Sequence, residues 1–206
     1  MREDTTRMSR SLSSGAHSSD PLAHPGYGTQ SGDRHIVARI VVIGNAAGGK
    51  STLARHLAWR RELPVIEMDR LLWLPGWQLA PEADYARRHA EIVAQDRWVI
   101  DGLGRQDSIA ERLARSTEIV LIDLPLWMHF WLAAERQVAW AREGLDNPPA
   151  GAVEMPPTRE LFRTMWEVDR SWMPEIRNMC AEAELAGKAV MRLGSIDEID
   201  AFARRL

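Results

Sequence analysis

The chain has 206 residues, of which 45% are hydrophobic and 27% are charged, a balance typical of a globular domain. Its formal net charge is −3, so no overall basic field attracts nucleic acid or an anionic membrane surface, and we expect neither as a partner. The single cysteine, Cys180, excludes an intrachain disulfide and favours a reducing, cytoplasmic location.

Residues 1–35 differ in composition from the rest of the chain. They are rich in Ser, Gly, His and Pro and contain almost no aliphatic side chains. Such a segment cannot bury enough apolar surface to offset the conformational entropy that it would lose on ordering. We therefore expect a disordered tail at 1–35 and one folded domain at 36–206.

Within 36–206, short β-branched runs alternate with longer stretches of helical pattern. The expected strands cover 39–43, 64–69, 97–101, 117–123 and 189–193. The expected helices cover 50–61, 81–95, 107–115, 126–143, 158–185 and the residues after Ser195. This alternation predicts an α/β fold in which helices cover both faces of a parallel sheet.

Some helix boundaries have local signals. Prolines and glycines make 144–157 a loop, and Pro174 is expected to bend or break the helix at 158–185. Ser195 and Glu198 have the spacing of a capping box, which predicts the start of the last helix.

The helix at 126–143 carries a stripe of apolar residues. Trp127 and Trp131 recur at helical spacing with Ala134, Val138 and Ala141. Helical spacing of large apolar side chains predicts a face that packs in the core.

Residues 44–51 read GNAAGGKS and match the phosphate-binding pattern G-x-x-x-x-G-K-[ST] at every defined position. The motif follows an apolar strand and precedes a helix, so its backbone N–H groups can converge on phosphate oxygens at the helix N-terminus. Lys50 can reach the β- and γ-phosphates, and only Lys50 and Lys188 among the 26 cationic residues are lysines. The alternative, a chance glycine-rich turn, explains neither the flanking elements nor this lysine.

We therefore predict ATP as a cofactor, with Mg²⁺ bound through the hydroxyl of Ser51. Thr52 can support the α-phosphate. The predicted cofactor-binding residues are Gly44, Asn45, Ala46, Ala47, Gly48, Gly49, Lys50, Ser51 and Thr52.

Several segments together resemble one protein family. They are the P-loop itself, Leu63–Asp69, Leu72–Trp77, Trp98–Gly102 and Ile122–Pro125. Over residues 38–206 the chain resembles the adenylate-kinase-like P-loop proteins often labelled DNA topology modulation proteins. The resemblance implies a three-layer fold like that of nucleoside monophosphate kinases. Its sheet would have five parallel strands in the order 2-3-1-4-5, followed after the fourth strand by a helical lid, here at about 126–165.

Three of the expected strands end in an aspartate, and ligands of open α/β sheets gather at the carboxyl ends of the strands. The resemblance places the third strand beside the P-loop strand, so Asp101 is assigned to Mg²⁺ together with Ser51. It also places Asp69 where related small-molecule kinases contact the phosphoryl acceptor; the alternatives are a helix cap or a salt bridge with Arg70. For Asp123 we expect a cap on the long helix that follows it.

Three further residues are candidates for binding the acceptor. Trp73 and Trp77 follow Asp69 in an irregular Pro-Gly segment, where they form either an aromatic wall for a planar acceptor or a cover over the edge of the sheet. Residues 101–105 read DGLGR and resemble the D-G-F-P-R segment of nucleoside monophosphate kinases. That likeness adds Arg105 to the candidate substrate residues.

Phosphoryl transfer needs cations near the migrating group, and lid arginines supply them in kinases. The candidates are Arg136 and Arg142 on the long helix and Arg159 and Arg163 after the loop. Arg136 matches a position where the family that the chain resembles carries arginine. The spacing of Arg159 and Arg163 beside nearby glutamates instead fits a solvated helix face.

These residues favour a kinase that transfers the γ-phosphoryl group of ATP to a nucleotide or another small hydroxyl or phosphate acceptor. Its predicted catalytic residues are Lys50, Asp101 and Arg136. The alternative is a non-catalytic module that binds ATP or ADP and regulates a partner, which the few arginines of the expected lid favour. The six histidines show no metal-ligand spacing, so we predict no structural metal.

Overall fold

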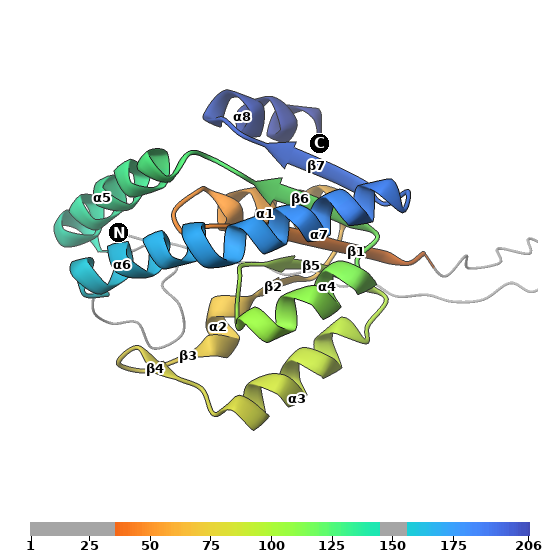
Figure 1. Cartoon of the computed structure of the whole chain (residues 1–206), viewed down its shortest axis with the longest axis horizontal. Helices are drawn as coiled ribbons and strands as arrows, with labels where there is room; N and C mark the ends of the chain where they lie inside the picture. Colours follow the sequence, from red (N-terminus) through yellow and green to blue (C-terminus); the bar gives the residue numbers. More distant parts are fainter. Residues whose placement is uncertain (1–35, 145–155) are drawn as a thin grey trace, which may run out of the picture. The chain divides into compact units, whose positions relative to one another are not determined.

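The computed structural model describes residues 36–144 and 156–206. The predicted tail at 1–35 and most of the predicted loop at 144–157 lie outside the described residues. In the described part of the chain, one sheet contains five parallel strands, in the order β2-β5-β1-β6-β7 (Figure 1). These strands are β1 (Ala38–Gly44), β2 (Val65–Glu67), β5 (Arg97–Asp101), β6 (Glu118–Ile122) and β7 (Ala189–Leu193). The predicted α/β class and the strand order 2-3-1-4-5 are confirmed.

The strand register brings the functional loops to one edge of the sheet. β1 lies between β5 and β6, with Val42 opposite both Asp101 and Val120. Because all three strands are parallel, their carboxyl ends meet at the same edge. The loop after β1 and the last residue of β5 are therefore neighbours.

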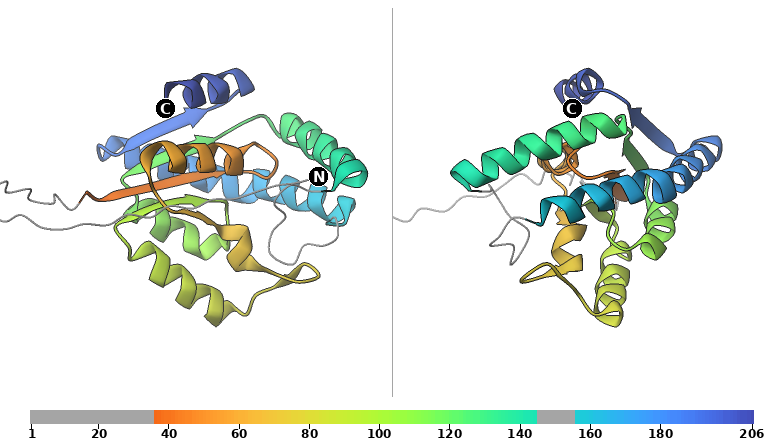
Figure 2. Two further views of the ribbon diagram at one scale, coloured as in Figure 1. Left: turned by 180° about the vertical axis from the view of Figure 1, so that it is seen from behind. Right: turned by 60° about the vertical axis from the view of Figure 1, so that its left-hand side comes forward.

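Helices cover both faces of the sheet (Figure 2). The longer helices are α1 (Lys50–Arg61), α3 (Glu82–Val93), α5 (Leu126–Glu143), α6 (Thr158–Glu167), α7 (Met173–Leu185) and α8 (Ile196–Arg205). Shorter helical segments are α2 (Met68–Leu72), a 3₁₀ turn at Gln106–Ser108 and α4 (Ile109–Arg115). The three-layer arrangement that the resemblance implied is confirmed.

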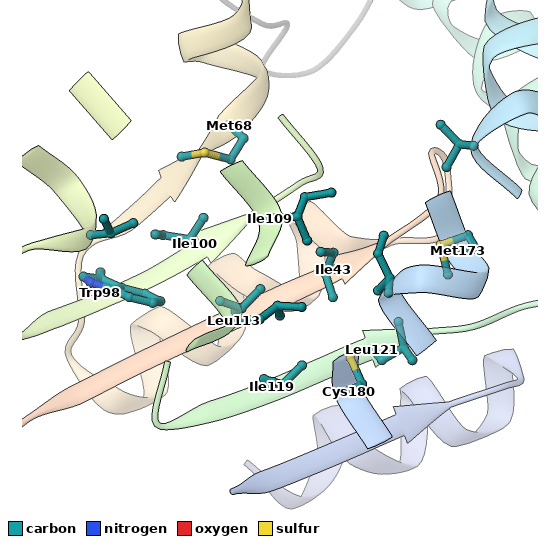
Figure 3. Packing of buried hydrophobic residues seen from close by; sticks show 14 of the residues in the cluster. Ile43, Met68, Trp98, Ile100, Ile109, Leu113, Ile119, Leu121, Met173 and Cys180 are labelled. Carbon is teal, nitrogen blue, oxygen red and sulfur yellow. The ribbon is translucent and has the colours of Figure 1, made fainter. Parts of the chain in front are cut away.

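Alternate residues of each strand face opposite layers. Val41 and Ile43 of β1 belong to a cluster with α3, α4 and α7, where Ile109, Leu113 and Met173 pack against the strands (Figure 3). Ile40 and Val42, which alternate with them on β1, pack against α1 and α8 in a second cluster. Since both faces are buried, the strands are apolar throughout, which is why they were predictable as short aliphatic runs.

The segment after β2 differs from the prediction. The strand expected at 64–69 ends at Glu67, and the chain then forms the short helix α2, so Asp69 lies in the first turn of a helix. The segment expected to be irregular contains an antiparallel hairpin of β3 (Trp73–Leu74) and β4 (Gln78–Leu79). Its turn uses Gly76 and Trp77 with positive φ angles of 73° and 58°.

The helix expected at 158–185 is interrupted earlier than predicted. A π-helix at Val168–Trp172 separates α6 from α7, and Pro174 lies in the first turn of α7. The N–H of Met173 bonds to the carbonyl oxygen of Val168 in the π-helix, whereas Pro174 has no N–H to donate, so the change in hydrogen bonding occurs next to this proline. Ser195 caps α8 as predicted, since its Oγ accepts a hydrogen bond of 3.2 Å from the N–H of Glu198. The Glu198 carboxylate accepts a hydrogen bond of 2.6 Å from the N–H of Gly194, one residue before the cap, so the reciprocal half of the capping box is displaced by one residue.

The buried face of α5 is not the one that its apolar stripe predicted. Trp127, Trp131 and Val138 are 64%, 62% and 51% exposed, whereas His129, Ala133 and Gln137 are buried. A helix turns by about 100° per residue, so positions two residues away lie on nearly opposite faces. Smaller and polar side chains occupy the inner face because the helix approaches the P-loop backbone there.

Among the described residues, no helix is long and apolar enough to cross a membrane.

Polar side chains are buried between α3 and α4. The Tyr85 hydroxyl group lies 3.0 Å from Ser108 Oγ and accepts a hydrogen bond from the N–H of Arg105. Arg112, fully buried, donates to the carbonyl oxygen of Leu103. His89 stacks on the Tyr85 ring, and its Nε2 has no hydrogen-bond partner within the described residues. This network fixes the loop that leaves β5.

The environment of His89 predicts a pH-dependent stability. Burial, reinforced by the charge of Arg112, lowers the pKa of His89 below its ordinary value of 6.5. The unfolded chain therefore binds this proton more tightly, so His89 contributes stability above pH 6.5 that is lost as the pH falls toward the folded-state pKa. We expect wild type to lose more unfolding free energy between about pH 7.5 and 5.5 than His89→Phe, by up to about 1.4 kcal/mol per pH unit.

Urea unfolding of the two proteins across this range measures the difference. The comparison cancels the other titrating groups, and phenylalanine preserves the stacking on Tyr85. Parallel pH profiles would show that His89 does not titrate in this way.

Candidate active site

The P-loop connects β1 to α1 by a path that requires glycine at its first residue. Gly44 has a φ of 150°, and a Cβ atom on it would lie 2.2 Å from the carbonyl oxygen of Ile122 on β6. At the other end, Gly49 precedes α1 with a φ of 79°, and among the described residues no side chain caps the helix. The first N–H groups of α1 are thus available for an anion.

Lys50 lies among groups of both charges. Its ammonium group donates a hydrogen bond of 2.7 Å to the carbonyl oxygen of Asn45, within the loop. Burial lowers the pKa of Lys50, and so does the charge of Arg136, while the carboxylates of Asp101 and Asp69 act in the opposite direction. The sheet edge, α2 and α5 therefore bring together four of the predicted site residues: Lys50, Asp69, Asp101 and Arg136.

Asp101 is the best-placed metal ligand among these residues. It is only 4% exposed, it accepts a hydrogen bond from Ser51, and its Oδ1 has no hydrogen-bond partner in the described residues. Burial raises the pKa of Asp101, whereas the charge of Lys50 and the Ser51 hydrogen bond lower it. A buried carboxylate oxygen without a partner beside a hydroxyl group fits Mg²⁺, which keeps several water ligands and needs few from the protein.

Asp69 and Arg136 interact electrostatically with each other and with Lys50. Asp69 is exposed as a residue, but the protein atoms packed around its carboxyl group desolvate it and raise its pKa, against the charges of Lys50 and Arg136. Desolvation likewise lowers the pKa of Arg136, while Asp69 counteracts this effect. Arg70 forms a salt bridge with Glu67 at 2.7 Å. The contact of Asp69 with an acceptor stays a prediction.

The other predicted acceptor residues are placed less directly. Trp73 and Trp77 pack edge to face, with ring centroids 5.7 Å apart, and both are partly buried in the hairpin. Arg105 forms a salt bridge of 3.2 Å with Glu82 on α3. The structure thus ties Arg105 to the helix beside the loop, and its role toward a substrate stays a prediction, as does that of the tryptophans.

All four candidate lid arginines are exposed as whole residues, although the protein atoms around the guanidinium group of Arg136 desolvate it. Arg142 is exposed on α5 beside Trp131 and Val138, and Arg159 and Arg163 are exposed on α6. Among the four, Arg136 has an electrostatic interaction with Asp69 and Lys50. Its role in phosphoryl transfer stays a prediction that rests on the resemblance.

The prediction that Asp123 caps α5 is wrong. Its buried carboxylate forms salt bridges with Arg177 of α7, at 2.8 Å, and with Arg192 of β7. Burial alone would raise the pKa of Asp123, but the two arginines hold it below its ordinary value. Pro125 occupies the position before α5, so the helix starts without a side-chain cap from the described residues.

Two residues from the helices after β6 hold the P-loop, and the sequence did not identify them. His129 Nδ1 of α5 lies 2.7 Å from the carbonyl oxygen of Ala46. The backbone carbonyl of Met165 on α6 accepts a hydrogen bond of 2.7 Å from Asn45 Nδ2. These contacts span 83 and 120 residues along the chain, and no local pattern signals them.

No protein-family model matches the chain, and no curated protein matches it by sequence. The resemblance to the DNA topology modulation proteins is therefore not confirmed. Solved structures that align with it include a gluconokinase from Sinorhizobium meliloti 1021, with 17% identity, a TM-score of 0.45 and coverage of 84% of this chain and 94% of that one. Another is the shikimate kinase from Acinetobacter baumannii in complex with shikimate, with 12% identity, a TM-score of 0.48 and coverage of 84% and 93%. A shikimate kinase from Aquifex aeolicus aligns with 14% identity, a TM-score of 0.42 and coverage of 81% and 92%. At these identities and TM-scores the alignments say nothing about the activity of this protein.

Proposed function

We propose that the protein is a P-loop kinase that transfers the γ-phosphoryl group of ATP to a hydroxyl or phosphate oxygen of a small acceptor. The observation that carries this proposal is the convergence of Lys50, Asp69, Asp101 and Arg136 beside a complete P-loop at the carboxyl edge of the sheet. A module that only bound nucleotide would not need a desolvated carboxylate and an arginine beyond the Mg²⁺ ligands. The motif resemblance supports the same class of activity.

Each group of residues has a separate proposed role in phosphoryl transfer. The N–H groups of the P-loop and α1 would bind the phosphates, and Ser51 and Asp101 would hold Mg²⁺, which supplies charge neutralisation between the β- and γ-phosphates when bound. Lys50 and Arg136 would stabilise the negative charge that develops on the migrating group. We also propose that residues 126–165, which include α5 and most of α6, form the lid of a domain covering 36–206.

Asp69 is proposed to orient a hydroxyl acceptor and to accept its proton. The acceptor oxygen forms a bond to the γ-phosphorus while the bond to the bridging oxygen of ADP breaks, and the hydroxyl proton passes to the Asp69 carboxylate. Desolvation raises the pKa of Asp69, which makes the carboxylate a better base.

Acceptor-stimulated ADP formation from Mg-ATP tests the proposal. A panel of nucleoside monophosphates and small hydroxylated compounds would be assayed with the full-length chain, and we expect one class to raise turnover well above the rate with ATP alone. Tight ATP binding without stimulation by any acceptor would favour the non-catalytic ATP- or ADP-binding module instead.

The variant Asp69→Asn tests the acceptor site within that assay. Asparagine removes both the charge-assisted hydrogen bond and the proton acceptor, so kcat/KM for a hydroxyl acceptor is expected to fall by about 10²–10⁴-fold, with the affinity for ATP within about threefold of wild type. Glu67→Gln is the control, because it removes a neighbouring carboxylate that is paired with Arg55 and Arg70. Equal effects of the two substitutions would show that general electrostatics, rather than contact with the acceptor, explains the loss.

A further inference from the structure

We propose that His129 is a positioning residue for nucleotide binding: it fixes the orientation of the peptide between Ala46 and Ala47 in the P-loop. The inference rests on the proposed function insofar as the P-loop binds phosphate. His129 is 1% exposed on the inner face of α5, and its Nδ1 lies 2.7 Å from the carbonyl oxygen of Ala46. Neither the phosphate-binding motif nor the predicted acceptor site includes it.

The direction of this hydrogen bond follows from its acceptor. A carbonyl oxygen can only accept, so His129 Nδ1 carries the proton and donates it. Burial lowers the pKa of His129, an effect that the hydrogen bond to Ala46 and the carboxylates of Asp169 and Asp123 oppose and the charge of Lys50 reinforces. A neutral ring with its proton on Nδ1 satisfies both observations.

Holding the Ala46 carbonyl also orients the next N–H. In a planar trans peptide the C=O of one residue and the N–H of the next point in opposite directions. The N–H of Ala47 is therefore directed away from the His129 ring. Ala47 has a φ of 61°, a conformation that alanine rarely adopts and that the surrounding contacts must maintain. A peptide flip would replace this donor with a carbonyl oxygen facing any phosphate.

The ring also explains why glycine follows Ala47. A Cβ atom on Gly48 would lie 2.8 Å from Cε1 of His129 and 3.0 Å from Cγ2 of Ile122. The imidazole thus packs directly against the loop backbone as well as bonding to it. A side chain at Gly48 would displace the ring or the loop.

A second contact anchors the residue before this peptide. Asn45 Nδ2 donates to the Met165 carbonyl, and Asn45 Oδ1 accepts a hydrogen bond of 2.8 Å from the N–H of Ala46. With Asn45 fixed from α6 and Ala46 fixed from α5, the peptide that follows is held from both helices. His129 supplies the part of this arrangement that a single substitution can remove without altering the loop sequence.

Binding of MgADP and of pyrophosphate, measured by calorimetry on the full-length chain, tests the inference. His129→Leu removes the donor and should weaken binding by about tenfold or more, the usual effect of losing a buried hydrogen bond that holds a phosphate donor. His129→Asn places an N–H donor near the position of Nδ1 and should bind within about threefold of wild type. Gln137→Leu, on the same buried face of α5, serves as the packing control and should also bind within about threefold.

The outcomes separate the positioning role from a packing role. If the Leu variant does not fold, the similarly sized pair His129→Gln and His129→Met repeats the comparison without adding charge, because only glutamine can donate to the carbonyl. Folded Leu or Met variants that bind as tightly as wild type, or amide variants as weak as they are, would overturn the role of His129 and leave the proposed function intact. Wild type that binds neither MgADP nor pyrophosphate would overturn the proposed function itself.

Discussion

Replacing Lys50 by alanine should reduce ADP formation by at least roughly 10²–10³-fold, the usual effect of removing one electrostatic partner of a transition state. In the kinase that we propose, the ammonium group is the mobile charge of the P-loop, and it lies among Asp69, Asp101 and Arg136. Arginine should not restore activity, since its rigid planar group does not replace a compact ammonium in a tight loop.

The other lysine provides a matched control for this experiment. Lys188 donates hydrogen bonds to carbonyl oxygens at the end of α4, 2.9 Å from that of Ala114, and takes no part in the candidate site. Lys188→Ala should therefore lower the free energy of unfolding and leave turnover within about threefold of wild type. Steady-state ADP formation and thermal unfolding of both variants give the comparison. Full turnover by Lys50→Ala would refute the proposed mechanism.

Gly44→Ala should lower the free energy of unfolding by about 2–6 kcal/mol, from unfavourable backbone conformation and overpacking together. The added Cβ would meet the carbonyl oxygen of Ile122 at 2.2 Å while φ stays at 150°. That oxygen belongs to β6, the direct neighbour of β1, so relief requires the strands to separate. Because the free energy of unfolding of a typical domain is about 5–15 kcal/mol, a loss of this size would leave the variant only marginally stable.

Gly187→Ala isolates the steric part of this loss. Gly187 also has a positive φ, 86°, but a Cβ atom there would meet nothing within 4 Å. Only the backbone term remains, about 1–2 kcal/mol. Urea unfolding followed by circular dichroism measures both variants. Equal losses would show that the clash with β6 is relieved at no cost.

The elements that the sequence predicted best are those with clear ends. The bounds of α1 and β5 agree with the prediction, because glycine precedes α1 and an aspartate with Gly102 follows the apolar run of β5. The sequence-based prediction was wrong at two places where the residue pattern is compatible with more than one local arrangement. Residues 64–69 were assigned to one strand, but the chain changes from strand to the short helix α2 after Glu67. The stripe on α5 has helical spacing without revealing which face meets the loop.

The candidate site divides in the same way. Lys50 and Ser51 follow from a local motif, whereas the role of Asp101 was assigned through the strand order that the resemblance implied, an order that the structure has. Arg136 was also singled out by the resemblance, and its role stays a prediction. His129 could not be found, because its role depends on the path of α5 across the P-loop, and tertiary packing alone determines that path.

The contact between Asn45 and α6 has an asymmetric tolerance to substitution. The π-helix begins three residues after Met165, and the acceptor that Asn45 uses is a backbone carbonyl. Any apolar side chain that fills the buried position at 165 therefore preserves this anchor, whereas at 45 the amide must both donate to α6 and accept from Ala46. In a library of random substitutions, we therefore expect apolar replacements of Met165 to be tolerated and replacements of Asn45 to be lost, although the two residues form one hydrogen bond.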